Sequence, residues 1–247
     1  MKFVKPLLRI LLVIVVVVGV VFAITQRAHQ TCNEIDIEIA YEGENLPVTE
    51  AEIAETIQKA DVALGKQVKE IDLKAVHNAI ANNALIRSID HSGFRGSNLV
   101  VKLTLEEILM QVFCANEQHY FITTNGKVLP YTERIKERLI IVNGESLPTQ
   151  KKASIQKGTM QSIFAMAKYI TQTSDREAQY RQIHLNSKKQ IELVPTIGNY
   201  TILFGDTSRM EEKFAALDHF FQQVTTTDRG DEYKHLDVRF KNKIIAS

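Results

Sequence analysis

The sequence has little of what most enzymes and nucleic-acid-binding proteins carry. Its 247 residues include no tryptophan, two cysteines and five prolines, and the formal net charge is only +1. A charge so close to neutral provides no strong electrostatic attraction for nucleic acid. The chain also has no phosphate-binding glycine loop, no nucleophile-elbow motif and no His-Glu-x-x-His helix. We therefore predict no catalytic residue, no cofactor, no metal ligand and no nucleic-acid partner.

The seven histidines are too scattered for a local metal site. No two of them lie three to five residues apart, the spacing that local metal pairs use. Asp218 and His219 are adjacent on a predicted helix, where sequence neighbours point in different directions, so they make a poor acid–base pair. Scattered surface histidines are the better interpretation, and the chain is predicted not to be an enzyme.

The two cysteines, Cys32 and Cys114, allow two interpretations. A disulfide between them would close a loop of about 80 residues and would stabilise the fold by ~4 kcal/mol in the chain-entropy model. The alternative is two unpaired thiols, with Cys114 buried on its strand. The sequence contains no information on their separation in space, so both interpretations stay open.

One long apolar run stands near the N-terminus. Residues 10–24 are apolar without interruption, and three cations, Lys2, Lys5 and Arg9, precede them. The stretch 7–25 has 19 residues, which as a helix would measure roughly 28 Å, close to the thickness of the hydrocarbon layer. The excess of cations before the run places the N-terminus in the cytoplasm and the bulk of the chain outside it. We therefore expect a single transmembrane helix.

A cleaved signal peptide is the alternative to a retained anchor. The segment Val21-Phe22-Ala23 has small or branched residues, Val21 and Ala23, at the positions that precede a cleavage site. However, the apolar run continues through Ala23 and Ile24 with no polar region before that bond. The length of the run therefore favours the retained anchor.

Residues 34–106 predict three strands of a compact domain. Residues 35–39 alternate between apolar and acidic side chains, which is typical of a half-buried strand. Residues 86–91 predict a second strand, and the alternation over 99–105 predicts a third. We expect the first and last strands to pair in parallel, because the helices between them can supply the crossover.

Two helices are predicted between the first and second strands. Thr49 and Glu52 form a capping box, so a helix is expected to follow to about residue 60. Asp72 can cap a second helix over residues 72–82. The predicted order is therefore β-α-α-β-β.

After residue 106 the pattern becomes mostly β. Asn125 and Gly126 form the strongest short hairpin signal available. Residues 139–142 predict a short buried strand, and helical spacing appears over residues 159–171. The remaining expected elements are strands over 183–185, 191–194 and 200–204, a helix capped by Ser208, and a last strand over 236–240.

Four segments of this second region carry a resemblance to a known family. They are a strand entering a hairpin over 120–130, an apolar strand ending in glycine over 139–144, a strand ending in glycine over 200–205 before a helix that contains Lys213, and a final segment over 236–245. In this order they resemble the bacterial cell-division family FtsQ (DivIB), and the β-α-α-β-β module is similar to a POTRA domain. The expected fold class is α+β, with an N-terminal transmembrane helix, a POTRA-like domain and a β-rich domain with flanking helices, over residues 1–26, 34–106 and 107–247.

The resemblance implies a non-catalytic divisome scaffold that acts in cell division and septum formation. It implies a single-pass protein of the bacterial inner membrane, with its N-terminus in the cytoplasm and its bulk in the periplasm. The implied partners are the FtsB–FtsL pair, bound by strand addition at the C-terminal edge, and other divisome membrane proteins. The residues to which the resemblance assigns partner contacts are Tyr233, Asp237, Arg239, Lys241, Asn242, Lys243, Ile244 and Ile245.

Alternation along the last strand predicts which side chains face inward. Leu236, Val238 and Phe240 share one face and are expected to pack against the core. Asp237 and Arg239 share the other face and are expected to meet solvent or a partner. Charged residues also guard exposed edges against aggregation, and this remains an alternative to binding.

Two other functions stay open at this point. One is another POTRA-containing module of envelope assembly or secretion, although the chain after residue 115 leaves no room for a transmembrane barrel. The other is a membrane-anchored envelope enzyme with a dispersed site, which lacks any visible nucleophile–base or metal constellation.

Overall fold

The computed structural model describes residues 11–22, 29–43, 45–114, 119–225, 233–241 and 243–247. Helices and strands both contribute to it, so the α+β class is confirmed. The chain divides into two compact units, with the main boundary between Glu106 and Glu107 and with residues 43–45 in the second unit. Each unit has its own buried core.

Residues 11–22 form a helix, and its large apolar side chains are all more than half exposed. The other residues of the predicted span, 7–10 and 23–25, lie outside the described residues. Within the part of the chain that is described, no helix is long and apolar enough to cross a membrane.

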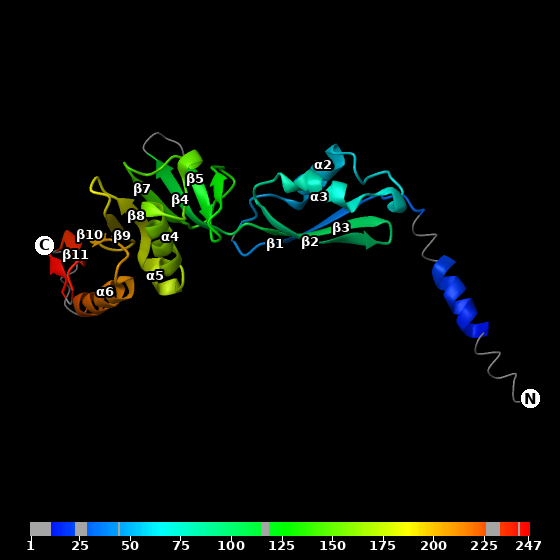
Figure 1. Ribbon diagram of the computed structural model, residues 1–247. Helices are drawn as coiled ribbons and strands as arrows, with labels where there is room; N and C mark the ends of the chain where they lie inside the picture. Colours follow the sequence, from blue (N-terminus) through cyan, green and yellow to red (C-terminus); the bar gives the residue numbers. More distant parts are fainter. Residues whose placement is uncertain (1–10, 23–28, 44, 115–118, 226–232, 242) are drawn as a thin grey trace, which may run out of the picture. The chain divides into compact units, whose positions relative to one another are not determined.

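The first unit is a three-stranded sheet with two helices on one face (Figure 1). β1 pairs in parallel with β3, which confirms the predicted crossover, and β2 pairs antiparallel with β3. β2 runs four residues further than predicted, because the chain turns at Gly96, where φ is 69°. The elements are β1 (Ile35–Ala40), α2 (Glu50–Lys59), the short η1 (Val68–Glu70), α3 (Leu73–Ala81), β2 (Ile86–Arg95) and β3 (Asn98–Leu105).

Both helices of this unit begin where the sequence predicts. The Glu52 N–H donates to the Thr49 hydroxyl at 3.3 Å, and the Thr49 N–H donates to the Glu52 carboxylate at 3.0 Å, which is a complete capping box. Asp72 accepts the N–H of Lys74 at 2.9 Å at the start of α3. The buried residues that the helices and β3 contribute to the core include Ile53, Ile57, Val76, Ile80, Leu99, Val101 and Leu103.

The second unit is built on a mixed sheet of nine strands in the order β12-β11-β10-β9-β8-β7-β4-β5-β6. Its strands are β4 (Ile108–Cys114), β5 (His119–Thr123), β6 (Val128–Pro130), β7 (Ile140–Gly144), β8 (Tyr180–Leu185), β9 (Ile191–Pro195), β10 (Thr201–Gly205), β11 (His235–Asp237) and β12 (Ile245–Ala246). Its helices are η2 (Gln150–Lys152), α4 (Gly158–Ile170), α5 (Ser174–Gln179) and α6 (Met210–Thr225).

Local turn chemistry sets much of this sheet. β5 and β6 form the predicted hairpin, with Gly126 at φ 83° and the Thr123 N–H bonded to the Lys127 carbonyl at 3.0 Å. β8, β9 and β10 are successive antiparallel neighbours, which confirms the predicted meander.

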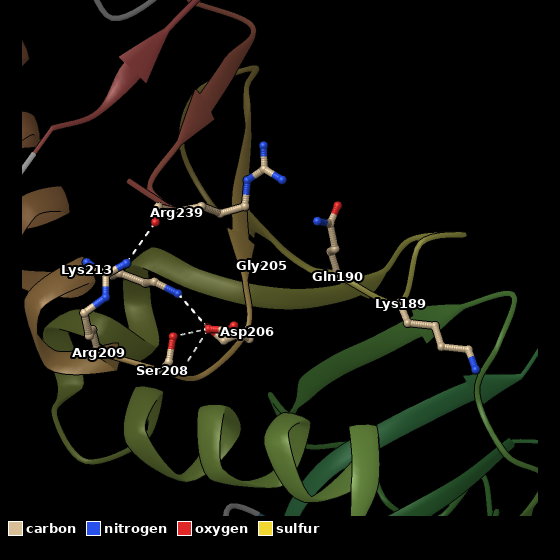
Figure 2. Close-up of a pocket in the computed structure, with 8 residues that line it drawn as sticks. All are labelled: Lys189, Gln190, Gly205, Asp206, Ser208, Arg209, Lys213 and Arg239. Atoms are coloured by element: carbon tan, nitrogen blue, oxygen red, sulfur yellow. Dashed lines mark hydrogen bonds and ion pairs between the residues drawn. The ribbon is translucent and has the colours of Figure 1, made fainter. Parts of the chain in front are cut away.

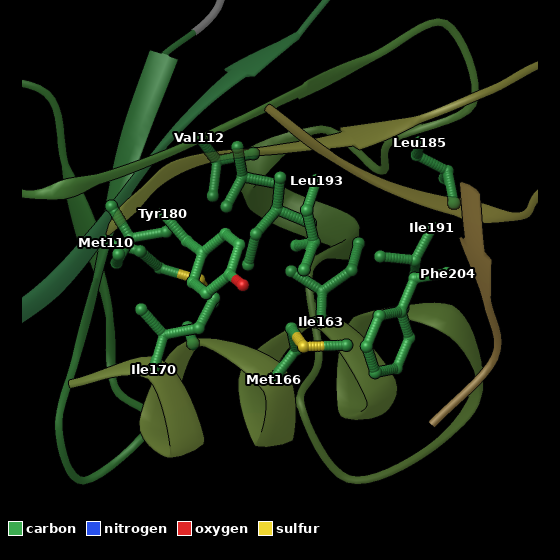
Figure 3. Close-up of a cluster of buried hydrophobic side chains, with 14 of the residues drawn as sticks. Met110, Val112, Ile163, Met166, Ile170, Tyr180, Leu185, Ile191, Leu193 and Phe204 are labelled. Atoms are coloured by element: carbon green, nitrogen blue, oxygen red, sulfur yellow. The ribbon is translucent and has the colours of Figure 1, made fainter. Parts of the chain in front are cut away.

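The core of the second unit lies between this sheet and α4. Figure 3 shows Ile163, Met166 and Ile170 of α4 pointing toward residues from several strands. Tyr180 at the start of β8 and Phe204 on β10 are completely buried in this cluster. In this core, strands that are far apart in the sequence therefore pack against the same helix, α4.

The start of α6 differs from the prediction. The helix begins at Met210, so Ser208 lies two residues before its first residue. The Ser208 hydroxyl donates to the Asp206 carboxylate instead. Arg209, between them and the helix, has φ of 50°, a left-handed conformation that the sequence pattern does not signal.

The two cysteines are both buried and unpaired in the structure. Cys32 belongs to the first unit, and its thiol donates to the Glu34 carbonyl at 3.4 Å. Cys114 ends β4 in the second unit, and its thiol donates to the Pro148 carbonyl at 3.3 Å. Burial raises the pKa of the Cys114 thiol, which disfavours the reactive thiolate.

Candidate partner-binding edge

The C-terminal strands form one edge of the nine-stranded sheet. β11 pairs in parallel with β10 and antiparallel with β12. Within the described residues no strand pairs with the far side of β12. His235 and Ser247 exchange two backbone hydrogen bonds, at 2.9 and 3.0 Å. Because successive residues of a strand alternate, the N–H and C=O of Ala246 point away from β11 toward the open side.

The last long strand is shorter than predicted. β11 ends at Asp237, because its carboxylate accepts the N–H of Arg239 at 3.0 Å and closes a local turn. Leu236 and Val238 are buried as expected. The prediction for Phe240 is wrong: it lies after the turn and is 43% exposed.

Asp237 and Arg239 form a two-pronged ion pair beside this turn. The Arg239 Nε donates to Asp237 Oδ1 at 2.9 Å, and Nη2 donates to Oδ2 at 2.6 Å. These hydrogen bonds lower the pKa of Asp237 and raise that of Arg239. The two side chains therefore pair with each other while Arg239 stays 38% exposed and Asp237 20% exposed.

Two cations lie near the exposed Phe240 ring. The Arg239 guanidinium is 5.9 Å from the ring centroid, and Lys243 Nζ is 5.3 Å from it. An aromatic ring and two cations therefore project together from the β11–β12 connection.

A buried lysine holds the end of β10. The side chain of Lys213 on α6 is 3% exposed. Its Nζ donates to the carbonyls of Phe204 at 3.0 Å and Asp206 at 2.8 Å, and to Asp206 Oδ1 at 3.2 Å. All three ammonium protons are thereby used. Hydrogen bonds from Ser208 and then Lys213 lower the pKa of the Asp206 carboxyl.

Gly205, the last residue of β10, lies close to Arg239 of the C-terminal edge (Figure 2). Its φ is 82°, and a Cβ there would lie 2.9 Å from Arg239 Cγ. Arg209 reaches across and donates to the Arg239 carbonyl at 2.9 Å, as Figure 2 shows. Together these residues border a hollow of about 230 Å³ beside the β11 turn.

The other predicted contact residues fall on different sides of the edge. Tyr233 is half-buried, with its ring 5.7 Å from that of Phe220. Ile244 is half-buried against the core, and Ile245 is 45% exposed. Lys241 and Lys243 are exposed, and Asn242 lies outside the described residues.

Three residues of this region were not predicted as part of it. Arg209 and Asp206 have no sequence signal, because their roles depend on the left-handed backbone at Arg209 and on its hydrogen bond to the Arg239 carbonyl, thirty residues away. The sequence marks Lys213 only as part of a family motif. A lysine on the inner face of an amphipathic helix is the signal that could have marked it, since such a lysine needs partners for its charge.

A known protein family matches this second unit. The profile of the family "FtsQ/DivIB, C-terminal related" matches residues 109–247, which is more than half of the chain. The chain belongs to this family. Membership associates it with the cell-division proteins FtsQ and DivIB, which are non-catalytic scaffolds. No curated protein matches the sequence at a significant level.

The matched region contains the whole sheet except the start of β4. It therefore includes the β10 glycine, the Lys213 helix and the β11–β12 edge of this FtsQ/DivIB-related chain.

Proposed function

We propose that this chain is a scaffold of the cell-division machinery that binds a partner of the FtsB–FtsL type by strand addition to β12. The observation that carries the proposal is the open edge at β12 in a member of the FtsQ/DivIB-related family. Other divisome membrane proteins are further partners, and septum formation is the process served.

The physical basis is the unpaired backbone at the edge. An incoming strand can bond to the N–H and C=O of Ala246, while neighbouring side chains supply specificity. β12 has only two residues, so backbone bonds alone are few. The exposed side chains of Ile245, Phe240 and Lys243 flank the same edge and offer apolar and cationic contacts.

For the N-terminal part we propose a membrane anchor over residues 7–25, with the N-terminus in the cytoplasm and the two units in the periplasm. The helix over 11–22 exposes large apolar side chains all around, which is unfavourable in water and favourable in hydrocarbon. The first unit is assigned to the POTRA type on its β-α-α-β-β order and its parallel β1–β3 pairing.

The test is Ala246→Pro. Proline removes the outward N–H, while the bonds between β11 and β12 use the alternate residues and remain. We expect at least a tenfold loss in capture of the FtsB–FtsL pair by the full chain from solubilised membranes. Ile244→Pro should act in the same direction, because Ile244 is on the same backbone side by alternation.

Ala246→Val is the matched control, since it keeps the N–H and suits a strand. It should capture the partner nearly as well as the parent chain. If Ala246→Pro unfolds at the parent temperature and still captures the partner fully, the interface is not at this edge.

A further inference from the structure

One stretch of the second unit carries an excess of positive charge. Residues 146–174 contain four lysines and no aspartate or glutamate. The whole chain, in contrast, has 30 cations and 29 anions. This stretch therefore has a local positive charge that the near-neutral total conceals.

The fold brings two parts of this stretch to the turn between β5 and β6. The β5–β6 turn lies against the same stretch, since a Cβ on Gly126 would lie 2.1 Å from Ile155 Cδ1 and 3.7 Å from Phe164. Lys168 extends over the Phe164 ring, 5.8 Å from its centroid. We call the resulting set the lysine patch; it consists of Lys151, Lys152, Lys157 and Lys168, all exposed.

The patch is not neutralised from within. Among the described residues, Lys151, Lys152 and Lys157 form no ion pair. Some exposed lysines elsewhere are paired, such as Lys59 with Glu55 at 2.7 Å and Lys102 with Glu38 at 2.6 Å. The first turn of α4, which begins beside Lys157, also carries no acidic residue. Like charges held together without counter-charges repel one another, so an external anion would be bound favourably.

The composition of the patch narrows the kind of partner. Protein interfaces are depleted in lysine and take their binding energy from tryptophan, tyrosine and arginine. Lysine is instead a strongly hydrated point charge on a flexible stem, with no fork for precise recognition. Such a set fits a diffuse surface of phosphate groups better than a shaped protein epitope.

We propose that the lysine patch docks the second unit onto anionic phospholipid headgroups of a bilayer. The inference rests on the proposed anchor, which would tether the unit at high effective concentration near that surface. Each lysine close to an anionic leaflet contributes about a fivefold gain in association. Docking in this manner would bring the sheet toward the membrane without inserting it.

The test uses the full chain reconstituted with vesicles of phosphatidylcholine alone or with about 30 mol % phosphatidylglycerol. Lysines are acetylated with an amine-reactive reagent, and the rate at each position is measured by mass spectrometry. We expect Lys151, Lys152 and Lys157 to react at least threefold more slowly on the anionic vesicles. High salt should abolish the protection, because it shortens the screening length. Lys188, exposed on the β8–β9 turn, should react equally on both.

Charge variants supply the matched comparison. In K151Q/K152Q/K157Q the protection of Lys168 should fall, whereas in K188Q/K189Q it should persist. Equal acetylation rates on the two vesicle types would overturn the proposal. Protection by soluble polyglutamate but not by anionic vesicles would also overturn it, in favour of an acidic polypeptide.

The failure of the anchor would look different. A chain that does not float with phosphatidylcholine vesicles at all would contradict the anchor, whatever the lysines do. A chain that floats with both vesicle types and shows no selective protection contradicts the patch alone. Partner capture by Ala246→Pro, compared with Ala246→Val, provides a third, independent readout of the edge.

Discussion

At the scale of single residues, the turn after β11 depends on the ionised form of Asp237. Its pKa is lowered by the hydrogen bonds from Arg239. A lowered folded-state pKa means that the stabilisation is fully present above the ordinary value near 3.8. It is lost as the pH falls through the lower folded-state value. Asp237→Asn should therefore cost about 1 kcal/mol at pH 7.

The measurement is chemical denaturation of both chains across pH. The stability difference between parent and Asp237→Asn should be constant from pH 7 to about 5 and shrink only below the ordinary carboxyl pKa. Asp36→Asn, at a carboxylate outside this turn, is the control. A difference that stays unchanged down to about pH 2 would mean that the charge of Asp237 does not hold the turn.

Gly205 supports the same turn through its lack of a side chain. An alanine there must adopt φ of 82° and also displace Arg239 Cγ, only 2.9 Å from the new Cβ. We expect Gly205→Ala to lower the free energy of unfolding by about 1–3 kcal/mol. In an Arg239→Ala background the cost should be smaller, because only the backbone strain remains. Additive effects in this double-mutant cycle would show that the two residues do not contact.

At the scale of elements, local chemistry was predictable, and so was the parallel pairing of β1 with β3, whereas the pairings at the C-terminal edge were not. The capping box at Thr49 and the hairpin at Gly126 depend on neighbours within four residues, and both are as predicted. The last strand is shorter than alternation indicates, because the Asp237 side chain takes the Arg239 N–H. The local sequence does not show whether a charged residue such as Asp237 continues the strand or ends it by accepting a backbone N–H.

The candidate site was predictable only in outline. The resemblance pointed to the C-terminal segment, and Leu236 and Val238 are buried there as alternation predicts. The parallel pairing of β11 with β10 joins residues more than thirty positions apart. Contacts at such separation depend on the whole sheet, and hydrophobic periodicity describes only one element at a time.

At the scale of the whole molecule, the proposed topology makes the last prediction. A reporter enzyme that is active only outside the cytoplasm, fused after Ser247, should be active, because three cations precede the apolar run. Deleting residues 7–25 should abolish its activity. Fractionation should place the full-length chain in the membrane, since 19 residues suffice to span it. A soluble fragment that begins near Ile24 would instead show a cleaved signal, and the tether on which the docking of the lysine patch rests would be lost.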